Sequence, residues 1–232
     1  ARFLHVQVEE KRDEDGRKYK KESLIFPRYH QLQAVRRLVD AARSEGVGQN
    51  YLIEHSAGSG KSNTIAWLAH RLSSLHDEQD QRIFDSVIVI TDRRVLDQQL
   101  QDTIYQFEHR QGVVQKIDED YRQLAEALEN AIPIIITTLQ KFPFVSRQLV
   151  KMAEERNHQG TGLLHTRHCA VIIDEAHSSQ SGESATELKG VLGGETLHEA
   201  ARQKAAEEGQ ENLEELYRSM AKRARQANLS FF

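Results

Sequence analysis

Residues 54–63, EHSAGSGKSN, combine glycines, a lysine and a serine at a spacing that suits phosphate binding. Gly58 and Gly60 can adopt positive φ, which lets the backbone approach a phosphate closely. Successive backbone N–H groups at a helix start would form a nest for an anion. We expect Lys61 to reach the β- and γ-phosphates of a nucleotide and the hydroxyl of Ser62 to ligate Mg²⁺.

The strict phosphate-loop pattern, G-x-x-x-x-G-K-[ST], asks for glycine at the position that His55 occupies. The alternative interpretation is therefore a chance Gly-Ser-Gly-Lys turn. An apolar segment before the loop and a helical stripe after it favour the phosphate loop. His55 receives no chemical role beyond packing or orienting the loop. Nucleotide binding is assigned here to Gly58, Ser59, Gly60, Lys61, Ser62 and Asn63.

A second group of chemically active residues lies at 171–177, VIIDEAH. An apolar segment that ends in two acids is typical of a Walker B site. Asp174 would hold Mg²⁺ through its water shell, and Glu175 would orient and deprotonate the attacking water. His177 is placed to sense the γ-phosphate. A solvated acidic turn is the alternative, but the phosphate loop upstream favours a catalytic set of Lys61, Asp174, Glu175 and His177.

The fold must bring the loop and the acidic pair to one edge of a sheet. Apolar runs predict strands, which lie at 51–55, 85–92, 112–117, 133–138 and 169–174. Helical stripes alternate with them, at 28–44, after the phosphate loop, and at 93–106, 118–130 and 144–157. This alternation predicts an α/β fold with a mostly parallel sheet and helices on both faces.

Two further segments flank this α/β unit. Residues 3–26 alternate in polarity around the turn residues DEDG, which predicts a hairpin. From residue 195 the chain becomes charged and helical, and one apolar stripe predicts a docked helical appendage. The stripe consists of Leu213, Leu216, Tyr217 and Met220.

At this point the sequence resembles the first RecA-like domain of superfamily-2 helicases and translocases, because DEAH follows a buried strand and GSGKS lies upstream. The segment RYHQLQAV resembles the adenine-recognising Q-type motif of that group. The resemblance implies ATP as the nucleotide, with Gln31 reading the adenine edge and Arg28 or Tyr29 stacking nearby.

Two more segments resemble the DNA-contacting motifs of the same group. ITDRRVLDQQL resembles motif Ia, and ITTLQKF resembles the next motif in order. The resemblance implies phosphate contacts that carry no base information. They are expected from Arg93, Arg94, Thr137, Thr138, Gln140 and Lys141. In the alternative interpretation, one arginine pairs with Asp92 or Asp97.

The closer resemblance is to the R subunit, the motor subunit of type I restriction enzymes. That group often carries histidine at the first loop position, and FPRYHQ, TDRRVLDQQ, TTLQKF and IIDEAHSSQSG also match it in wording and order. The resemblance implies an ATP-dependent translocase on double-stranded DNA, with specificity and methyltransferase subunits as partners. It also implies a nuclease domain and a second RecA-like domain with an arginine finger in the full-length chain.

The resulting domain plan has three parts. Residues 1–27 are a hairpin or linker from a preceding domain, residues 28–194 the RecA-like P-loop NTPase motor domain, and residues 195–232 a helical appendage leading towards motif III. Both ends of the sequence are interpreted as cuts within a longer protein. ATP binding is expected in this piece, with weak hydrolysis, because an arginine finger can contribute ~10³–10⁵ in rate.

Composition narrows the alternatives. The chain has 232 residues, a formal net charge of −4 and one cysteine, which excludes a disulfide framework and a cysteine-based metal cluster. The histidines show no metal-ligand spacing. No apolar run approaches the ~20 residues that span a bilayer, so we expect a cytoplasmic protein without membrane contact. Another superfamily-2 translocase, a GTPase and a nucleotide-locked binding module remain alternatives, although no N-K-x-D guanine motif occurs.

Overall fold

The structure is a computed structural model whose described residues cover most of the expected α/β unit. They are 3–13, 16–91, 94–107, 112–117, 120–142, 144–145, 148, 167–175, 188–192 and 227–232. The predictions for His177 and for the helical appendage from 195 to 226 lie outside these residues. Most of the helix expected at 144–157 also lies outside them.

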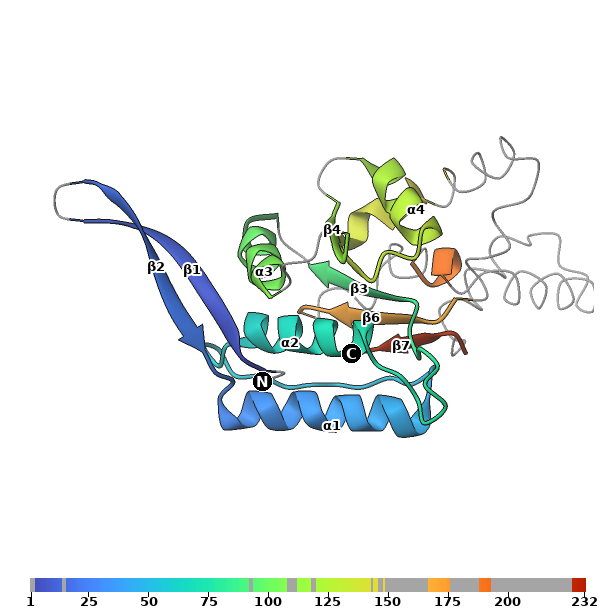
Figure 1. Ribbon diagram of the computed structural model, residues 1–232. Coiled ribbons are helices and arrows are strands. Elements are labelled where there is room, and N and C mark those ends of the chain that lie inside the picture. The colour runs from blue at the N-terminus through green and yellow to red at the C-terminus, as the bar shows by residue number, and fades with distance from the viewer. Residues whose placement is uncertain are drawn as a thin grey trace, which may run out of the picture.

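A five-stranded sheet forms the centre of the molecule, in the order β4-β5-β3-β6-β7 (Figure 1). Every neighbouring pair of strands is parallel. The predicted α/β fold with a parallel sheet is confirmed. The strands are β3 (Ser86–Thr91), β4 (Val114–Lys116), β5 (Ile134–Thr138), β6 (Cys169–Ile173) and β7 (Leu229–Phe231).

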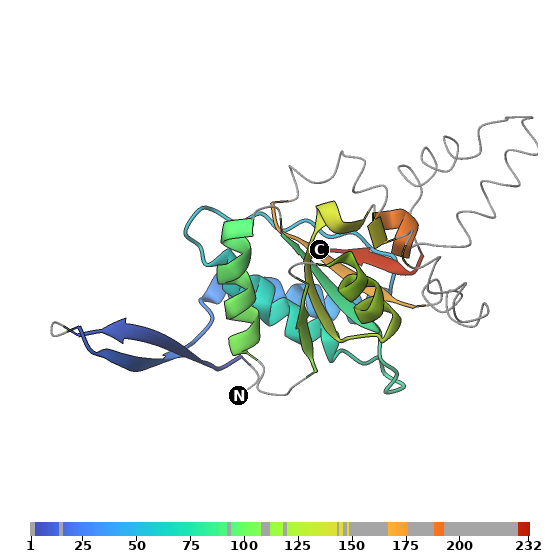
Figure 2. The same cartoon turned by 90° about the horizontal axis from the view of Figure 1, so that it is seen from above.

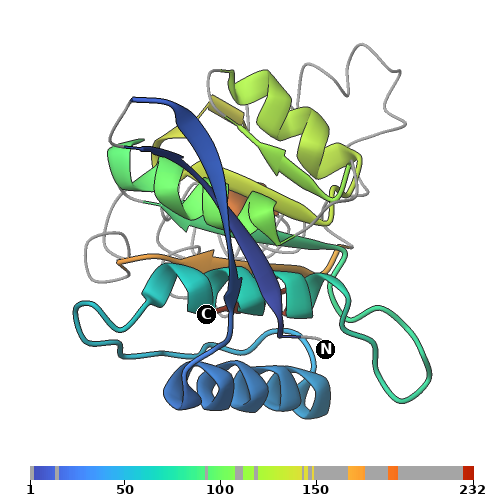
Figure 3. The ribbon, with the colours of Figure 1, turned by 60° about the vertical axis from the view of Figure 1, so that its left-hand side comes forward.

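Helices cover both faces of this sheet, because successive side chains of a strand point to opposite faces. In β3, Val87 and Val89 pack with the helices α1, α2 and α3, whereas Ile88 and Ile90 pack with α4. Figure 3 shows α1 farther from the sheet than α2, so α2 lies between α1 and the sheet. The helices are α1 (Tyr29–Glu45), α2 (Lys61–Ser73), α3 (Arg94–Gln106) and α4 (Tyr121–Glu129), and a 3₁₀ turn follows β5 at Leu139–Lys141.

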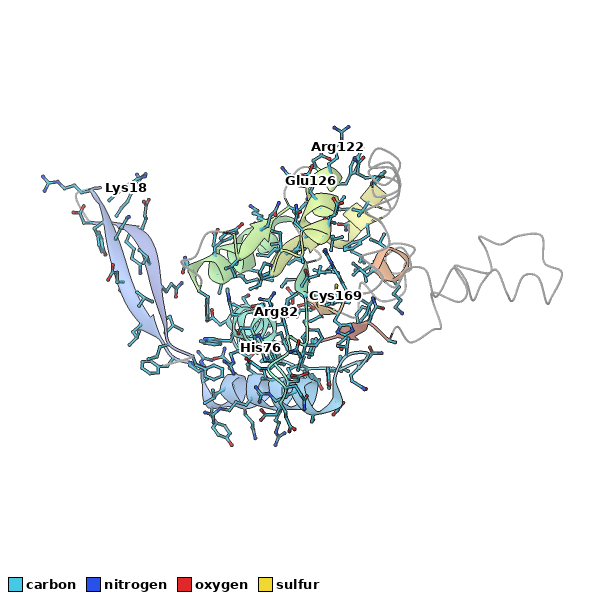
Figure 4. The ribbon with its side chains drawn as sticks, turned by 45° about the vertical axis from the view of Figure 1, so that its right-hand side comes forward. Lys18, His76, Arg82, Arg122, Glu126 and Cys169 are labelled. Carbon is cyan, nitrogen blue, oxygen red and sulfur yellow. The ribbon has the colours of Figure 1, made fainter. Side chains whose placement is uncertain are left out.

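Cys169 begins β6 as a buried residue on the face of the sheet that packs with α4. Burial, together with the negative charge of Asp85, raises the pKa of its thiol to about 12, although Arg167 lowers it. The thiol is therefore neutral at physiological pH and serves as a small apolar packing group. Figure 4 shows Cys169 within the body of the molecule.

The predicted hairpin is confirmed as two antiparallel strands, β1 (His5–Arg12) and β2 (Lys18–Ile25), which pair from His5↔Ile25 to Arg12↔Lys18. It extends away from the sheet and helices in two perpendicular views (Figures 1 and 2). Lys18 lies near its far end (Figure 4). The charged side chains that the structure describes on the hairpin are exposed to solvent.

The strand expected at 51–55 is wrong, and a strand at the end of the chain was not predicted. Residues 49–51 meet the sheet only at its β7 edge, where Tyr51 N donates to Phe231 O at 2.7 Å and Phe231 N donates to Gln49 O at 2.9 Å. Leu52, just beyond, is 85% exposed. The short apolar run NLSFF thus supplies the strand at one edge of the sheet, next to β6, although it lies within the residues expected to form a helical appendage.

Candidate functional site

The phosphate loop lies between α1 and the start of α2, and its conformation requires glycine. Gly58 and Gly60 have φ of 72° and 84°, the left-handed region that glycine occupies without strain. A Cβ atom on Gly60 would lie 2.5 Å from Gln31 Nε2. α2 begins directly afterwards at Lys61, so the loop delivers the chain into a helix N-terminus, as expected. Ser62 and Asn63 lie in the first turn of this helix.

Gln31 clamps the loop to α1 through both ends of its amide. Its Nε2 donates to Ser59 O at 3.2 Å and to Gly60 O at 2.9 Å, while its Oε1 accepts from Arg28 N at 2.8 Å. The side chain is only 3% exposed. This structural use of Gln31 was missed from the sequence, and its predicted contact with adenine stays a prediction.

Two histidines also contact the loop. His55 Nδ1 lies 2.9 Å from Ser59 Oγ, and His30 Nε2 lies 3.1 Å from Ser59 O. The two rings approach edge-on, with centroids 6.1 Å apart. The orienting role considered for His55 thus has a specific partner, Ser59, which the sequence alone did not identify.

The acidic pair faces Lys61 from the carboxyl end of β6. Asp174 N donates to Ile90 O at 2.9 Å, which holds this strand end against β3. Lys61 Nζ lies 3.4 Å from Asp174 Oδ1 and donates a hydrogen bond to Glu175 Oε1. The structure therefore brings together three of the four predicted catalytic residues, from segments 113 positions apart (174 minus 61).

Electrostatics in this cluster favour a charged lysine and a neutral histidine. Burial lowers the pKa of Lys61, but the hydrogen bond to Glu175 and the charges of both carboxylates outweigh it and raise the pKa overall. Burial lowers the pKa of His55, and the nearby His30 and Lys61 lower it further. An anion bound at the loop would thus be attracted by the positive charge of Lys61, which is protonated at physiological pH.

The geometry also fits a hard divalent cation next to Asp174. Its Oδ1 is buried and accepts no hydrogen bond from the residues that the structure describes, although it is ion-paired with Lys61. Carboxylate, hydroxyl and phosphate oxygens are the ligands that Mg²⁺ prefers. Asp174 and Ser62 carry two of these oxygen types, and their role as Mg²⁺ ligands stays a prediction.

Two cavities adjoin the phosphate loop. One of about 290 Å³ is lined by Lys61, Asp174 and Glu175 and by apolar residues that include Ile172 and Phe232. The other, of about 480 Å³, lies against residues 56–59 and is lined by Arg28, His30 and His55. Arg28 is thus placed beside a space next to the loop, whereas Gln31 is directed into the loop itself.

Four of the predicted DNA-contacting residues lie at or just after the carboxyl end of β5, but they differ in exposure. Thr137 is 1% exposed and does not reach the surface, which corrects its assignment as a phosphate ligand. Thr138 and Gln140 follow it towards the surface, and Lys141 Nζ donates to Ile117 O. Arg93 lies outside the described residues, and Arg94 begins α3.

A parallel sheet with a glycine-rich loop, a lysine and an acidic pair at its carboxyl edge defines a P-loop nucleotide-binding domain. The match to known families narrows this class. The chain belongs to the SWI2/SNF2 ATPase family, which residues 30–198 match. It is therefore a helicase-like ATPase motor domain, and the expected use of a nucleotide is confirmed at this level.

The resemblance to type I restriction enzymes is also confirmed. The chain is 29% identical over 160 residues to the type I restriction enzyme SsaAORF53P endonuclease subunit of Staphylococcus saprophyticus, covering 69% of this chain. It is 30% identical over 190 residues to the HindI endonuclease subunit of Haemophilus influenzae, covering 78% of this chain. The matches span 15% and 16% of those relatives.

The crystal structure of the UvsW helicase from bacteriophage T4 aligns with 90% of this chain and 60% of that chain, at a TM-score of 0.40 and 16% identity. In the part of the chain that the structure describes, no helix has the length and apolarity needed to cross a membrane.

Proposed function

We propose that the chain is the ATP-binding motor domain of a type I restriction endonuclease R subunit, which drives ATP-dependent translocation on double-stranded DNA before cleavage. The observation that carries this proposal is the meeting of Lys61, at the start of α2, with Asp174 and Glu175 at the end of β6. The endonuclease-subunit relatives support the choice of this enzyme among superfamily-2 translocases.

Each residue of the cluster has a proposed role in ATP binding or hydrolysis. The backbone of residues 58–63 would surround the phosphates, and Lys61 would exchange its carboxylate partners for the β- and γ-phosphates. Ser62 and Asp174 would hold Mg²⁺, which supplies charge neutralisation at the phosphates when bound. Glu175 would orient and deprotonate the attacking water.

Three further residues are proposed to support this site. His177 would sense the γ-phosphate from its position two residues after Glu175. Arg28 would contact the nucleotide from the cavity that it lines beside the loop. Gln31 would donate to the adenine edge only by giving up part of its clamp on Ser59 and Gly60, because both hydrogens of its Nε2 are already engaged.

DNA contact is proposed at the carboxyl edge, where Thr138, Gln140 and Lys141 follow β5 and the two arginines follow β3. Contacts to phosphates alone would suit a motor that must move along any sequence. Within the chain, we propose the boundaries 1–27, 28–194 and 195–232, with β7 returning from the third segment to the sheet of the second. A nuclease domain, a second RecA-like domain, and specificity and methyltransferase subunits belong to the proposed complete enzyme.

Replacing Lys61 by alanine in the full-length protein tests the proposed ATP site. The change removes the charge that faces both carboxylates, so we expect ATP binding, measured by calorimetry, to be lost. Translocation, measured by displacement of a triplex from linear duplex DNA, should be lost with it. Lys18→Ala is a matched control, because this lysine is exposed on the hairpin and its pairing with Glu10, at 3.8 Å, is weak.

An unchanged ATP affinity in Lys61→Ala would contradict the assignment of the phosphate loop. Wild-type protein that binds ATP but shows no DNA-stimulated hydrolysis would favour the nucleotide-locked binding module instead. GTP binding tighter than ATP binding would reject the assignment to a DNA motor of this kind.

A further inference from the structure

We propose that His55 and His30 are positioning residues that hold Ser59 and thereby preorganise the phosphate loop for the nucleotide. This inference rests on the proposed function, because it assigns these histidines to the same ATP site. It gives a role to His55, whose position in the strict loop pattern belongs to glycine.

Ser59 is attached to the rest of the protein through both its side chain and its main chain. Its Oγ lies 2.9 Å from His55 Nδ1, and its carbonyl oxygen lies 3.1 Å from His30 Nε2 and 3.2 Å from Gln31 Nε2. Ser59 N also donates to Ser56 O at 3.2 Å, which closes the loop turn. Fixing Ser59 therefore fixes the turn at 56–59.

The exposure of the loop shows why this attachment matters. Residues 56–58 are exposed, whereas Ser59 and Gly60 are half-buried against the N-terminus of α1. A glycine-rich turn has many accessible conformations, and ordering it on ligand binding opposes affinity. Contacts that hold the turn before the ligand arrives reduce this entropic cost.

The histidines are chemically suited to this attachment. A carbonyl oxygen only accepts, so His30 must carry its proton on Nε2 to donate to Ser59 O. The serine hydroxyl both donates and accepts, so a neutral His55 can bond to it in either tautomer. A glycine at position 55, as in the strict pattern, would leave Ser59 Oγ without this partner.

A double-mutant cycle on His55 and Ser59 tests the contact between them. ATP affinity and kcat are measured in the full-length protein for His55→Ala, Ser59→Ala and the double variant. Each single change should weaken ATP binding about two- to tenfold, the range expected for one hydrogen bond. The double variant should lose no more than the weaker-binding single variant, because both changes remove the same contact. The loss should fall on ATP affinity more than on kcat at saturating ATP, because the contact orders the loop before the nucleotide binds.

His55→Asn and His55→Gly separate hydrogen bonding from the space that the ring fills. Asparagine places a polar atom near the position of Nδ1 and should restore most of the ATP affinity lost in His55→Ala. His55→Gly restores the strict loop pattern and should still bind ATP more weakly than wild type. His76→Ala is a matched control, because this histidine is exposed and its ring lies 3.1 Å from Ser74 O, outside the phosphate loop.

Additive losses in the cycle, or wild-type affinity in His55→Gly, would overturn the positioning role. Failure of the proposed function has a different signature, which is ATP binding that survives Lys61→Ala. If Lys61→Ala abolishes binding while the losses at His55 and Ser59 are additive, only the inference about the histidines fails.

Discussion

Glu175 has an unusual backbone for a side chain with a proposed catalytic role. Its φ is 55°, in the left-handed region that non-glycine residues rarely adopt, and its carboxylate accepts a hydrogen bond from Lys61. Such a conformation is unfavourable and persists where surrounding contacts enforce it. The end of β6 thus holds the proposed base in a defined place next to the phosphate loop.

Replacing Glu175 by glutamine separates hydrolysis from binding. The amide keeps an oxygen that can accept from Lys61 but loses the basicity needed to deprotonate water. DNA-stimulated ATP hydrolysis should therefore fall by about 10²–10⁴, the usual contribution of a general base. ATP affinity, measured in the same full-length preparation, should remain close to wild type. Hydrolysis within a few-fold of wild type would remove Glu175 from the role of base.

At the scale of elements, α4 has a side-chain cap at its N-terminus. The Asp120 carboxylate accepts a hydrogen bond from Arg122 N at 2.9 Å, so it satisfies one of the donors left free at a helix N-terminus. Leu124 and Leu128 of the same helix are buried against the face of the sheet that contains Ile88 and Ile90. The cap and the buried stripe together explain why this short helix forms here.

Asp120→Ala should destabilise α4 by about 0.5–2 kcal/mol, the range measured for the loss of such caps. Hydrogen–deuterium exchange of peptides covering 121–129 in the full-length protein measures the local opening. Asp120→Asn should show a smaller effect, because asparagine is also a good cap. Glu126→Ala is the control, since Glu126 lies on the outer side of α4 with Arg122 (Figure 4). Equal exchange in Asp120→Ala and wild type would contradict the capping role.

At the scale of the whole molecule, the two faces of one sheet contribute two apolar cores. Ile135 and Ile136 are neighbours in β5, both 0% exposed, and they belong to opposite faces. The carboxyl edge of the sheet, where the proposed catalytic residues lie, depends on both cores, because the sheet holds the end of β6 against β3. A cavity in either core should therefore destabilise the same strands.

Ile135→Ala and Ile136→Ala should each destabilise the domain by about 2–5 kcal/mol, because each leaves a cavity in a close-packed core. Hydrogen–deuterium exchange of β3 peptides, at 86–91, should increase in both variants. Leu52→Ala is the control, since Leu52 is 85% exposed and its truncation should change stability by no more than about 0.5 kcal/mol. Increased exchange in only one isoleucine variant would mean that the two cores unfold independently.

Much of the fold follows from local sequence patterns. The apolar runs of β3, β5 and β6 are continuous because these strands are buried on both faces, and such runs are readily recognised. The hairpin at 3–26 follows from its alternation and turn. β7 was missed because three residues are too few to show a strand pattern, and its pairing partner β6 is distant in the sequence. The strand expected at 51–55 failed because pairing with Phe231 extends only to Tyr51.

The sequence by itself determined which residues form the phosphate loop and the acidic pair, because the backbone freedom of glycine and the charges of lysine and carboxylate follow from residue type. Alternation of strands and helices also placed both motifs at the carboxyl edge of one sheet. Only the tertiary structure decided that Gln31, His30 and His55 converge on Ser59 and Gly60, and that Thr137 is buried. These contacts depend on how α1 packs beside the loop and which face each strand residue takes, and packing of this kind is set by the whole core.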